Sequence, residues 1–167
     1  MANTAFPTHN EGKILNLLLR GVTLAPYTGA LYLAFLTNST SDTSLVELAP
    51  AGTYTGLNGR VAFSGTATNQ FTKFGTSTST AADTAGLTSD ETRLINLNPI
   101  TFTASGVTHS GIVGIAICSS QAVNATPSAM AQDTSVILYG DLTGGSVTLT
   151  AGQSITFAAG AIVVSLD

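Results

Sequence analysis

The sequence predicts a mainly β protein: a single antiparallel β-sandwich or small barrel, jelly-roll-like, with one N-terminal helix. Two observations lead to this fold class. Short runs rich in Val, Ile, Thr and Phe recur along most of the chain, separated by Gly, Ser, Asn and Pro turn signals. Only one stretch, close to the N-terminus, shows the apolar period of an amphipathic helix.

The chain of 167 residues fits one domain spanning 1–167, and we find no internal repeat and no linker that would divide it. Charged residues make up 8% of the chain, against about 25% in typical soluble domains. Thr, Ser, Ala and Gly take their place. A surface with so few charges opposes association weakly, so the composition predicts a subunit of an assembly.

The helix is expected at about 8–21. Thr8 and Glu11 have the spacing of a capping box, and Arg20-Gly21 supplies a cation in the last turn followed by a terminating glycine. An apolar stripe lies between these ends, formed by Ile14, Leu15, Leu17, Leu18 and Leu19. We expect this stripe to cover an open end or face of the sheet, with a partner-binding helix as the alternative. Residues 1–7 are expected to form an extended arm that is ordered only against a neighbouring subunit.

The segment 31–37 is expected to be a strand covered on both faces, because both of its alternating sets of side chains are mainly apolar. The preceding helix is the expected cover for one face. A polar loop follows at 38–45, and a short strand is expected at 60–63. The long polar region 64–90 is expected to pair weakly or to form a long loop, and it is a candidate interface.

Further strands are expected in the second half of the chain, at 94–102, 107–117, 135–142, 147–150 and 155–166. Asn98-Pro99 restricts the first of these to a sheet edge or to the beginning of a strand. Gly144-Gly145 is a hairpin signal, and another turn is expected at 151–154. These signals predict an antiparallel meander for the last third of the chain.

The residue types give no recognisable catalytic constellation. His109, in the strand pattern of Gly106–Ile117, is the best candidate, but no nucleophile-elbow motif and no metal-binding His-Glu-x-x-His accompanies it. We therefore expect a hydrogen-bonded structural histidine. His9, in the first turn of the helix, has no evident ligand partner, and Cys118 is expected to be a buried, inert thiol. The sequence thus predicts no enzyme, no catalytic or metal-binding residue and no cofactor.

Charge and hydropathy exclude two partner classes. The net charge is −4, and the five Lys and Arg residues are scattered, so nucleic acid is not an expected partner. The apolar runs are too short for a membrane helix, and the N-terminus lacks the features of a signal peptide. Because Cys118 is the one cysteine of the sequence, no intrachain disulfide can form, and synthesis in a reducing cytoplasm is expected.

Several stretches, taken together and in order, resemble a family of small tailed-phage virion structural proteins, described as tail-fibre-like or capsid-decoration-like. They cover most of the chain. The matching pieces are the helix end at 17–21, the strand 31–37, Glu47 followed by Tyr54, Gly56 and Arg60, then 100–102, 106–112, 138–143 and 151–161. The sequence departs from the family pattern at Ser110 and Ala116, where an aromatic and an acidic residue are usual, and in the insert 64–90.

The resemblance implies a structural protein of the virion. One alternative is a capsid cement or decoration protein that binds the major capsid protein on the outer shell. The other is a tail-fibre or tail-tip component contacting tail proteins, for which a trimer is expected. A homo-oligomer fits both. The low charge, the small single domain and the apolar N-terminal arm favour the capsid alternative, and the chain is short for a receptor-binding fibre, which usually carries a stalk repeat. Outside this family, a carbohydrate-binding or hydrolytic β-sandwich is the remaining interpretation.

Overall fold

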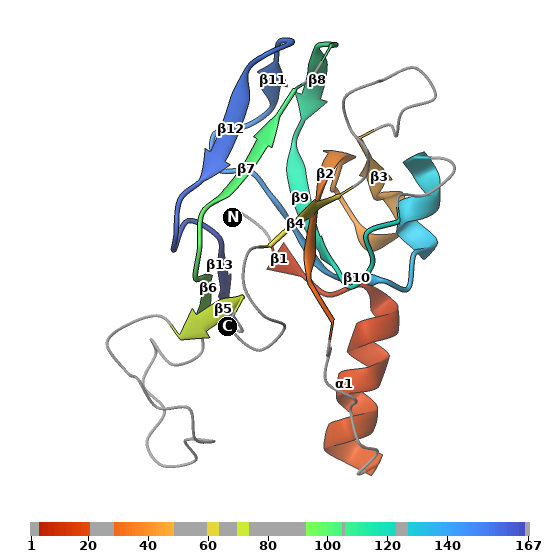
Figure 1. Cartoon of the computed structure of the whole chain (residues 1–167). Coiled ribbons are helices and arrows are strands. Elements are labelled where there is room, and N and C mark those ends of the chain that lie inside the picture. Colours follow the sequence, from red (N-terminus) through yellow and green to blue (C-terminus); the bar gives the residue numbers. More distant parts are fainter. Residues whose placement is uncertain are drawn as a thin grey trace.

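The computed structural model describes residues 4–20, 29–48, 60–63, 70–73, 93–104, 106–122 and 127–165. These residues form antiparallel sheets and one α-helix, which runs down and away from the strands (Figure 1). The described strands make open sheets that face each other, so the predicted mainly β fold is confirmed in its sandwich form.

The elements follow the predicted pattern of short strands. In chain order they are β1 (Thr4–Ala5), α1 (Thr8–Arg20), β2 (Tyr32–Asn38), the 3-10 helix η1 (Asp42–Ser44), β3 (Val46–Glu47), β4 (Val61–Ala62), β5 (Phe71–Lys73), β6 (Arg93–Asn96), β7 (Ile100–Thr103), β8 (His109–Ile112), β9 (Gly114–Cys118), the 3-10 helix η2 (Pro127–Gln132), β10 (Val136–Asp141), β11 (Val147–Leu149), β12 (Ser154–Phe157) and β13 (Val163–Ser165). The single strand expected at 94–102 is divided in two, because the chain leaves the strand conformation around Asn98-Pro99, and β7 begins directly after Pro99.

The largest sheet has the order β1-β10-β9-β2-β3, and β4 pairs with β2 beyond the end of β3. The central strands β9 and β2 run antiparallel from Tyr32 opposite Cys118 to Leu36 opposite Gly114. The other layer is made by the sheets β13-β6-β5 and β12-β7. Two aromatic contacts of Phe35 on β2 bridge the layers, with ring centroids 5.0 Å from Phe102 on β7 and 6.3 Å from Phe157 on β12.

The predicted meander in the last third of the chain is wrong. The glycines Gly144 and Gly145 do make a turn, with φ of 105° and 88°, but the strands on either side of it do not pair with each other. Instead β10 pairs with β9 and β11 with β8, while β12 pairs with β7 and β13 with β6. The segment from β6 to β9 therefore pairs with the segment from β10 to β13 in reverse order, which makes one long, bent antiparallel ribbon.

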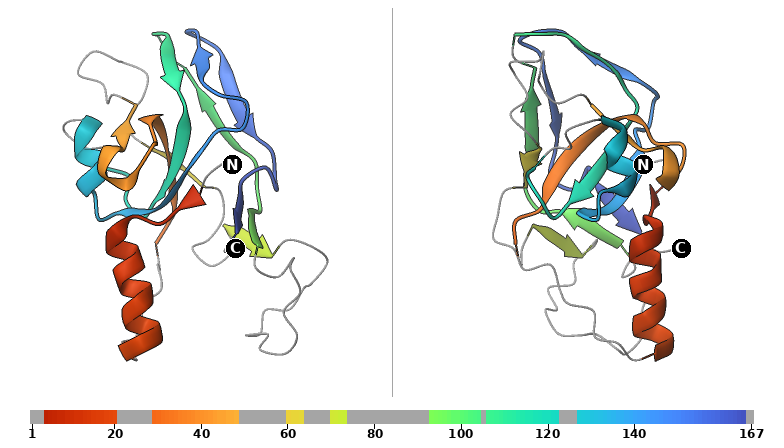
Figure 2. Two further views of the ribbon diagram at one scale, coloured as in Figure 1. Left: turned by 180° about the vertical axis from the view of Figure 1, so that it is seen from behind. Right: turned by 90° about the vertical axis from the view of Figure 1, so that its right-hand side faces the viewer.

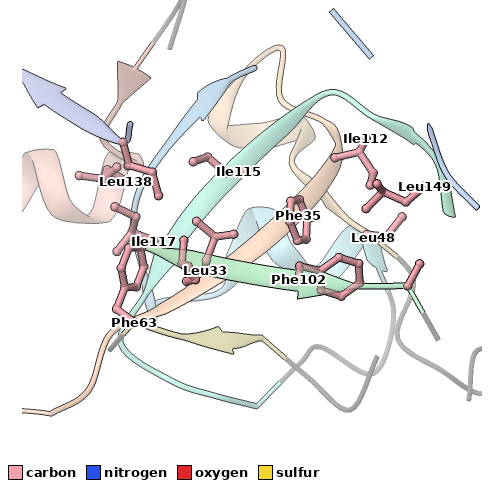
Figure 3. Packing of buried hydrophobic residues seen from close by; sticks show 13 residues of the cluster. Leu33, Phe35, Leu48, Phe63, Phe102, Ile112, Ile115, Ile117, Leu138 and Leu149 are labelled. Carbon is pink, nitrogen blue, oxygen red and sulfur yellow. The ribbon is translucent and has the colours of Figure 1, made fainter. Parts of the chain in front are cut away.

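The main core fills the space between the layers (Figure 3). Leu33 and Phe35 from β2 meet Ile115 and Ile117 from β9, and Phe102 closes the cluster from the other layer. Burial of these side chains supplies the main driving force for packing the layers, at roughly 1.5–3 kcal/mol for each large apolar residue.

The opposite face of the large sheet has its own apolar cluster, so the predicted two-sided burial of the 31–37 strand is confirmed. Ala34 and Leu36 of β2 lie there with Leu45, and Met130 of η2 packs on them. The expected cover by the N-terminal helix is wrong, since η2 covers this face. No apolar period marks η2 in the sequence, because Met130 is its one fully buried side chain and only the small Ala131 packs beside it.

The helix itself agrees with the predicted bounds of about 8–21 as far as the structure describes it, ending at Arg20. The arm expectation fails for Thr4 and Ala5, because these two residues pair with Gly140 and Tyr139 of β10 in their own chain. Residues 1–3, Gly21 and most of the candidate interface 64–90 lie outside the described residues; of that region, β5 is the described strand.

Candidate functional site

His109 lies in the core rather than in a site. Its side chain is 1% exposed, and its ring meets that of Phe102 edge-on at a centroid distance of 5.9 Å. Burial lowers the pKa of His109, which keeps the ring neutral near pH 7. The expected hydrogen-bonded role stays a prediction. A neutral ring enclosed by core side chains has no route to a solvent-borne substrate, so this position gives no support to catalysis.

A buried ion cluster lies beside the apolar cluster formed by Ala34, Leu36, Leu45 and Met130. It contains Glu47 and Arg60, two of the residues on which the family resemblance was based. Arg60 is 4% exposed and forms a two-pronged contact with Glu47, at 2.8 Å from Nε and 3.2 Å from Nη2. Nη2 also donates to Asp133 at 2.6 Å, and Nη1 donates to the hydroxyl of Ser135 and to the carbonyl of Ser120. The cluster therefore ties β3, β4 and the loops flanking η2 together.

Every nitrogen of the Arg60 guanidinium is engaged, so the group has no donor to offer a ligand. Burial alone would lower the pKa of Arg60, but hydrogen bonds to Glu47 and Asp133 outweigh it and raise the pKa. Burial alone would likewise raise the pKa of Asp133, but its hydrogen bonds from Arg60 and Ser135 lower it. Burial raises the pKa of Cys118, beside this cluster, to about 12, which agrees with the predicted inert thiol.

A polar depression lies where β2 and β10 end, and the Oγ of Ser39 donates there to a carboxylate oxygen of Asp141. The other lining residues are Thr37, Asn38, Thr40, Val113, Leu142, Gly144, Gly145 and Ser146. No histidine or cysteine is among these lining residues, so the depression has neither the imidazole nor the thiol that many nucleophilic sites use. Nor do the described residues contain a group of three or more His, Cys, Asp or Glu placed to hold a metal ion.

Packing in the core does not explain the position of α1, since Asn10 is its one buried residue. It is fixed at its first turn, where Nδ2 of Asn10 donates to the carbonyl oxygens of Val136 at 2.8 Å and of Ile137 at 2.9 Å. The side chain of His9 adds a contact from Nε2 to the carbonyl of Val136 at 3.0 Å. The register of β10 against β9 shifts between Val136 and Leu138, and such an irregularity directs carbonyl groups out of the ladder. Asn10 is 5% exposed, so the anchor is shielded from water.

Beyond this anchor the helix leaves the body of the protein (Figure 2). Leu15, Leu18 and Leu19 are 55%, 71% and 79% exposed, and we call these three residues the leucine face. They lie on one side of α1 because Leu15 is three residues from Leu18 and four from Leu19. Lys13, Asn16 and Arg20 occupy the other side together with Leu17, which is 40% exposed, and Arg20 donates there to the side chain of Asn16 at 3.1 Å.

A second uncovered apolar surface lies at the end of the sandwich from which α1 departs. A recess of about 210 Å³ opens there between the sheet β13-β6-β5 and the ends of β2, β9 and β10. We call it the apolar recess, and all its lining residues are apolar: Leu31, Phe71, Leu94, Ile117, Ile137, Leu138 and Val164. Figure 3 shows Ile117 and Leu138 side by side at the edge of the core. The sequence patterns predicted these positions as strand residues, except Phe71, which falls in the region 64–90 where weak pairing or a long loop was expected. They did not predict that the two layers part at this end.

The leucine face and the apolar recess are therefore the candidate functional surfaces, and both are suited to binding another apolar surface. The leucine-rich stripe was visible in the sequence; the signal for its exposure was weak, because a stripe of that width is also typical of a core helix. No protein-family model and no curated protein matches this sequence. None of the helices in the described parts of the chain is long and apolar enough to cross a membrane.

Proposed function

We propose that this chain is a non-enzymatic structural subunit of a bacteriophage virion: a decoration protein that binds the major capsid protein on the outer shell and stabilises the shell. It acts there as a homo-oligomer, after synthesis in the host cytoplasm. The observation that carries the assembly role is the leucine face, an apolar surface on a helix that covers no part of its own core.

The anchoring of α1 favours an assembly role over the alternative that the helix projects from the protein without a function. A helix of 13 residues is marginal in water by itself, so it needs a partner along its length or a fixed end. The buried amide of Asn10 supplies the fixed end, and the leucine face remains uncovered. Exposed leucines on an anchored helix lower the solubility of a protein, and a protein that functions alone has no reason to retain them.

The virion assignment follows from the resemblance to small tailed-phage structural proteins, and two features of the chain agree with it. The low charge leaves few repulsive contacts between closely packed copies. The buried Glu47–Arg60–Asp133 cluster serves the fold and offers no donor to a substrate, so a purely structural role leaves no described catalytic group unexplained.

Copy number in purified particles tests this proposal. Quantitative mass spectrometry should find the protein in proportion to the major capsid protein, and purified protein should rebind particles that lack it until the shell is saturated. Particles already carrying the protein are the matched control and should bind no more. A few copies per particle would instead place the protein in the tail, and absence from particles would overturn the virion assignment.

A further inference from the structure

We propose that the leucine face of one copy binds in the apolar recess of a second copy, so that the subunits assemble head to tail. This inference deepens the proposed function, on which it rests, by naming the partner of the leucine face. The two surfaces agree in chemistry: the leucine face and the lining of the recess contain only apolar side chains.

The sizes of the two surfaces also agree. A cavity of about 150 Å³ lined by Leu, Ile and Phe accommodates a benzene molecule, so a recess of about 210 Å³ has room for one or two leucine side chains. Leu18 and Leu19 are the most exposed members of the leucine face and protrude furthest from their own chain. They are therefore the side chains that we place in the recess.

The anchor of α1 prevents the leucine face from reaching the recess of its own chain. Ile137 contributes to both features, because its carbonyl accepts from Asn10 and its side chain lines the recess. The helix therefore starts at the rim of the recess. At 1.5 Å per residue, Leu19 lies about 14 Å further along the helix axis, and α1 runs away from both layers (Figure 1). With the anchor intact, the leucine face can fill the recess of another copy but not its own.

A contact between two different surfaces repeats from copy to copy. It closes into a ring if the rotation between neighbours allows closure and otherwise gives an open filament. Either assembly covers both apolar surfaces of every inner subunit. The geometry is thus distinct from a two-fold dimer in which leucine faces of two helices pack on each other and leave the recess empty.

The test is the mass of the purified full chain in solution, measured by analytical ultracentrifugation and by light scattering after size exclusion. The wild type should be oligomeric. Leu18→Glu should abolish assembly by charging the leucine face, and Leu94→Lys should abolish it by charging the recess, where Leu94 is 44% exposed. Asn16→Glu on the polar side of α1 and Leu97→Lys, at a residue 41% exposed that does not line the recess, are matched controls and should remain oligomeric.

Mixing the two assembly-defective variants gives the sharpest result. The Leu94→Lys chain retains an intact leucine face, and the Leu18→Glu chain retains an intact recess. A head-to-tail contact allows one intact interface per pair, so the mixture should form a one-to-one heterodimer and nothing larger. Circular dichroism of each variant should match the wild type, which separates lost assembly from misfolding.

Three results would overturn the inference: a monomeric wild type at its highest soluble concentration, a Leu94→Lys chain that still assembles, or a mixture that stays monomeric. The fate of the proposed virion role is read separately, from copy number in particles. If the protein is a monomer that decorates particles, the virion role is supported and this contact is wrong. If it assembles through this contact but is absent from particles, the contact is supported and the virion role is wrong.

Discussion

The Nδ2 of Asn10 donates to the carbonyl oxygen of Val136 at 2.8 Å, joining the first turn of α1 to β10 across 126 residues of sequence. This bond, and the second one from the same amide to Ile137, hold a helix whose remaining turns lie outside the core. The direction of α1, and with it the position of the leucine face, depends on this buried amide and on the neighbouring contact of His9 with Val136.

Replacing Asn10 with Ala should therefore loosen α1. The substitution removes both Asn10 bonds to β10. Because His9 still contacts the carbonyl of Val136, it is the Ile137 carbonyl that loses its Asn10 donor, and such a loss costs about 1–3 kcal/mol. Chemical denaturation should show that loss, and amide exchange should quicken through α1 before it does so in β9. Asn16→Ala, on the polar side of the same helix, is the matched control and should change stability by no more than about 0.5 kcal/mol. Equal effects of the two substitutions would show that the anchor does not fix the helix.

Arg60→Ala should be among the most destabilising substitutions in the chain. It leaves the carboxylate of Glu47, 3% exposed, without its partner, and breaking a buried ion pair costs roughly 3–5 kcal/mol. Urea unfolding of Arg60→Ala, Glu47→Gln and the double variant gives the coupling between the two residues. The double variant should be more stable than the sum of the single losses implies, because no unpaired carboxylate remains at position 47. Additive losses would show that the two side chains act independently.

How far the sequence predicts this fold depends on the distance along the chain between the residues that form each feature. The bounds of α1 and the two-sided burial of β2 were predicted, because capping, apolar period and alternation are local signals. The pairing of β11 with β8 was not, because the Gly144-Gly145 turn reports a change of direction and says nothing of which strand lies alongside.

The candidate site follows the same division. The leucine stripe was evident in the sequence, whereas its exposure depends on η2 covering the face that α1 was expected to cover. Glu47 and Arg60 were noted only as pieces of a resemblance, and the contact of Arg60 with Asp133 joins residues 73 positions apart. His9 was left without a partner for the same reason, since the carbonyl of Val136 that it contacts lies 127 positions away.

Stability should fall as the pH is lowered from 7 to 5, and His109 should account for much of that fall. Burial holds the pKa of His109 below its ordinary value of 6.5, so below pH 6.5 the unfolded chain binds a proton that the folded chain does not. The contribution of His109 to the free energy of unfolding is therefore complete above pH 6.5. Below pH 6.5 this contribution decreases, by at most about 1.4 kcal/mol per pH unit for one group.

Urea unfolding at a series of pH values checks this expectation. The His109→Leu chain should have a different absolute stability but a flatter dependence on pH in this window. The His9→Gln chain, altered at the other histidine, should keep the steeper dependence. A His109→Leu chain with the wild-type slope would mean that another group causes the acid sensitivity.

Gly114→Ala should destabilise the junction where β8 passes into β9. A Cβ at this position would lie 2.8 Å from the carbonyl oxygen of Gly140 and 2.9 Å from the Oγ of Ser39, closer than non-bonded atoms approach. Because Gly140 is backbone in the paired strand β10, the ladder must shift to make room, and overpacking of this kind costs about 1–3 kcal/mol.

The matched control is Gly29→Ala, since a Cβ there meets nothing within 4 Å and the residue does not have a positive φ. It should be neutral or stabilising by up to about 1 kcal/mol, through the smaller entropy of the unfolded chain. Adding Ser39→Gly to the Gly114→Ala chain removes the side-chain clash but leaves the Gly140 carbonyl in place, so recovery should be incomplete. Full recovery would assign the clash to Ser39 alone, and a Gly114→Ala chain as stable as the wild type would show that β9 and β10 are packed less tightly than the structure has them.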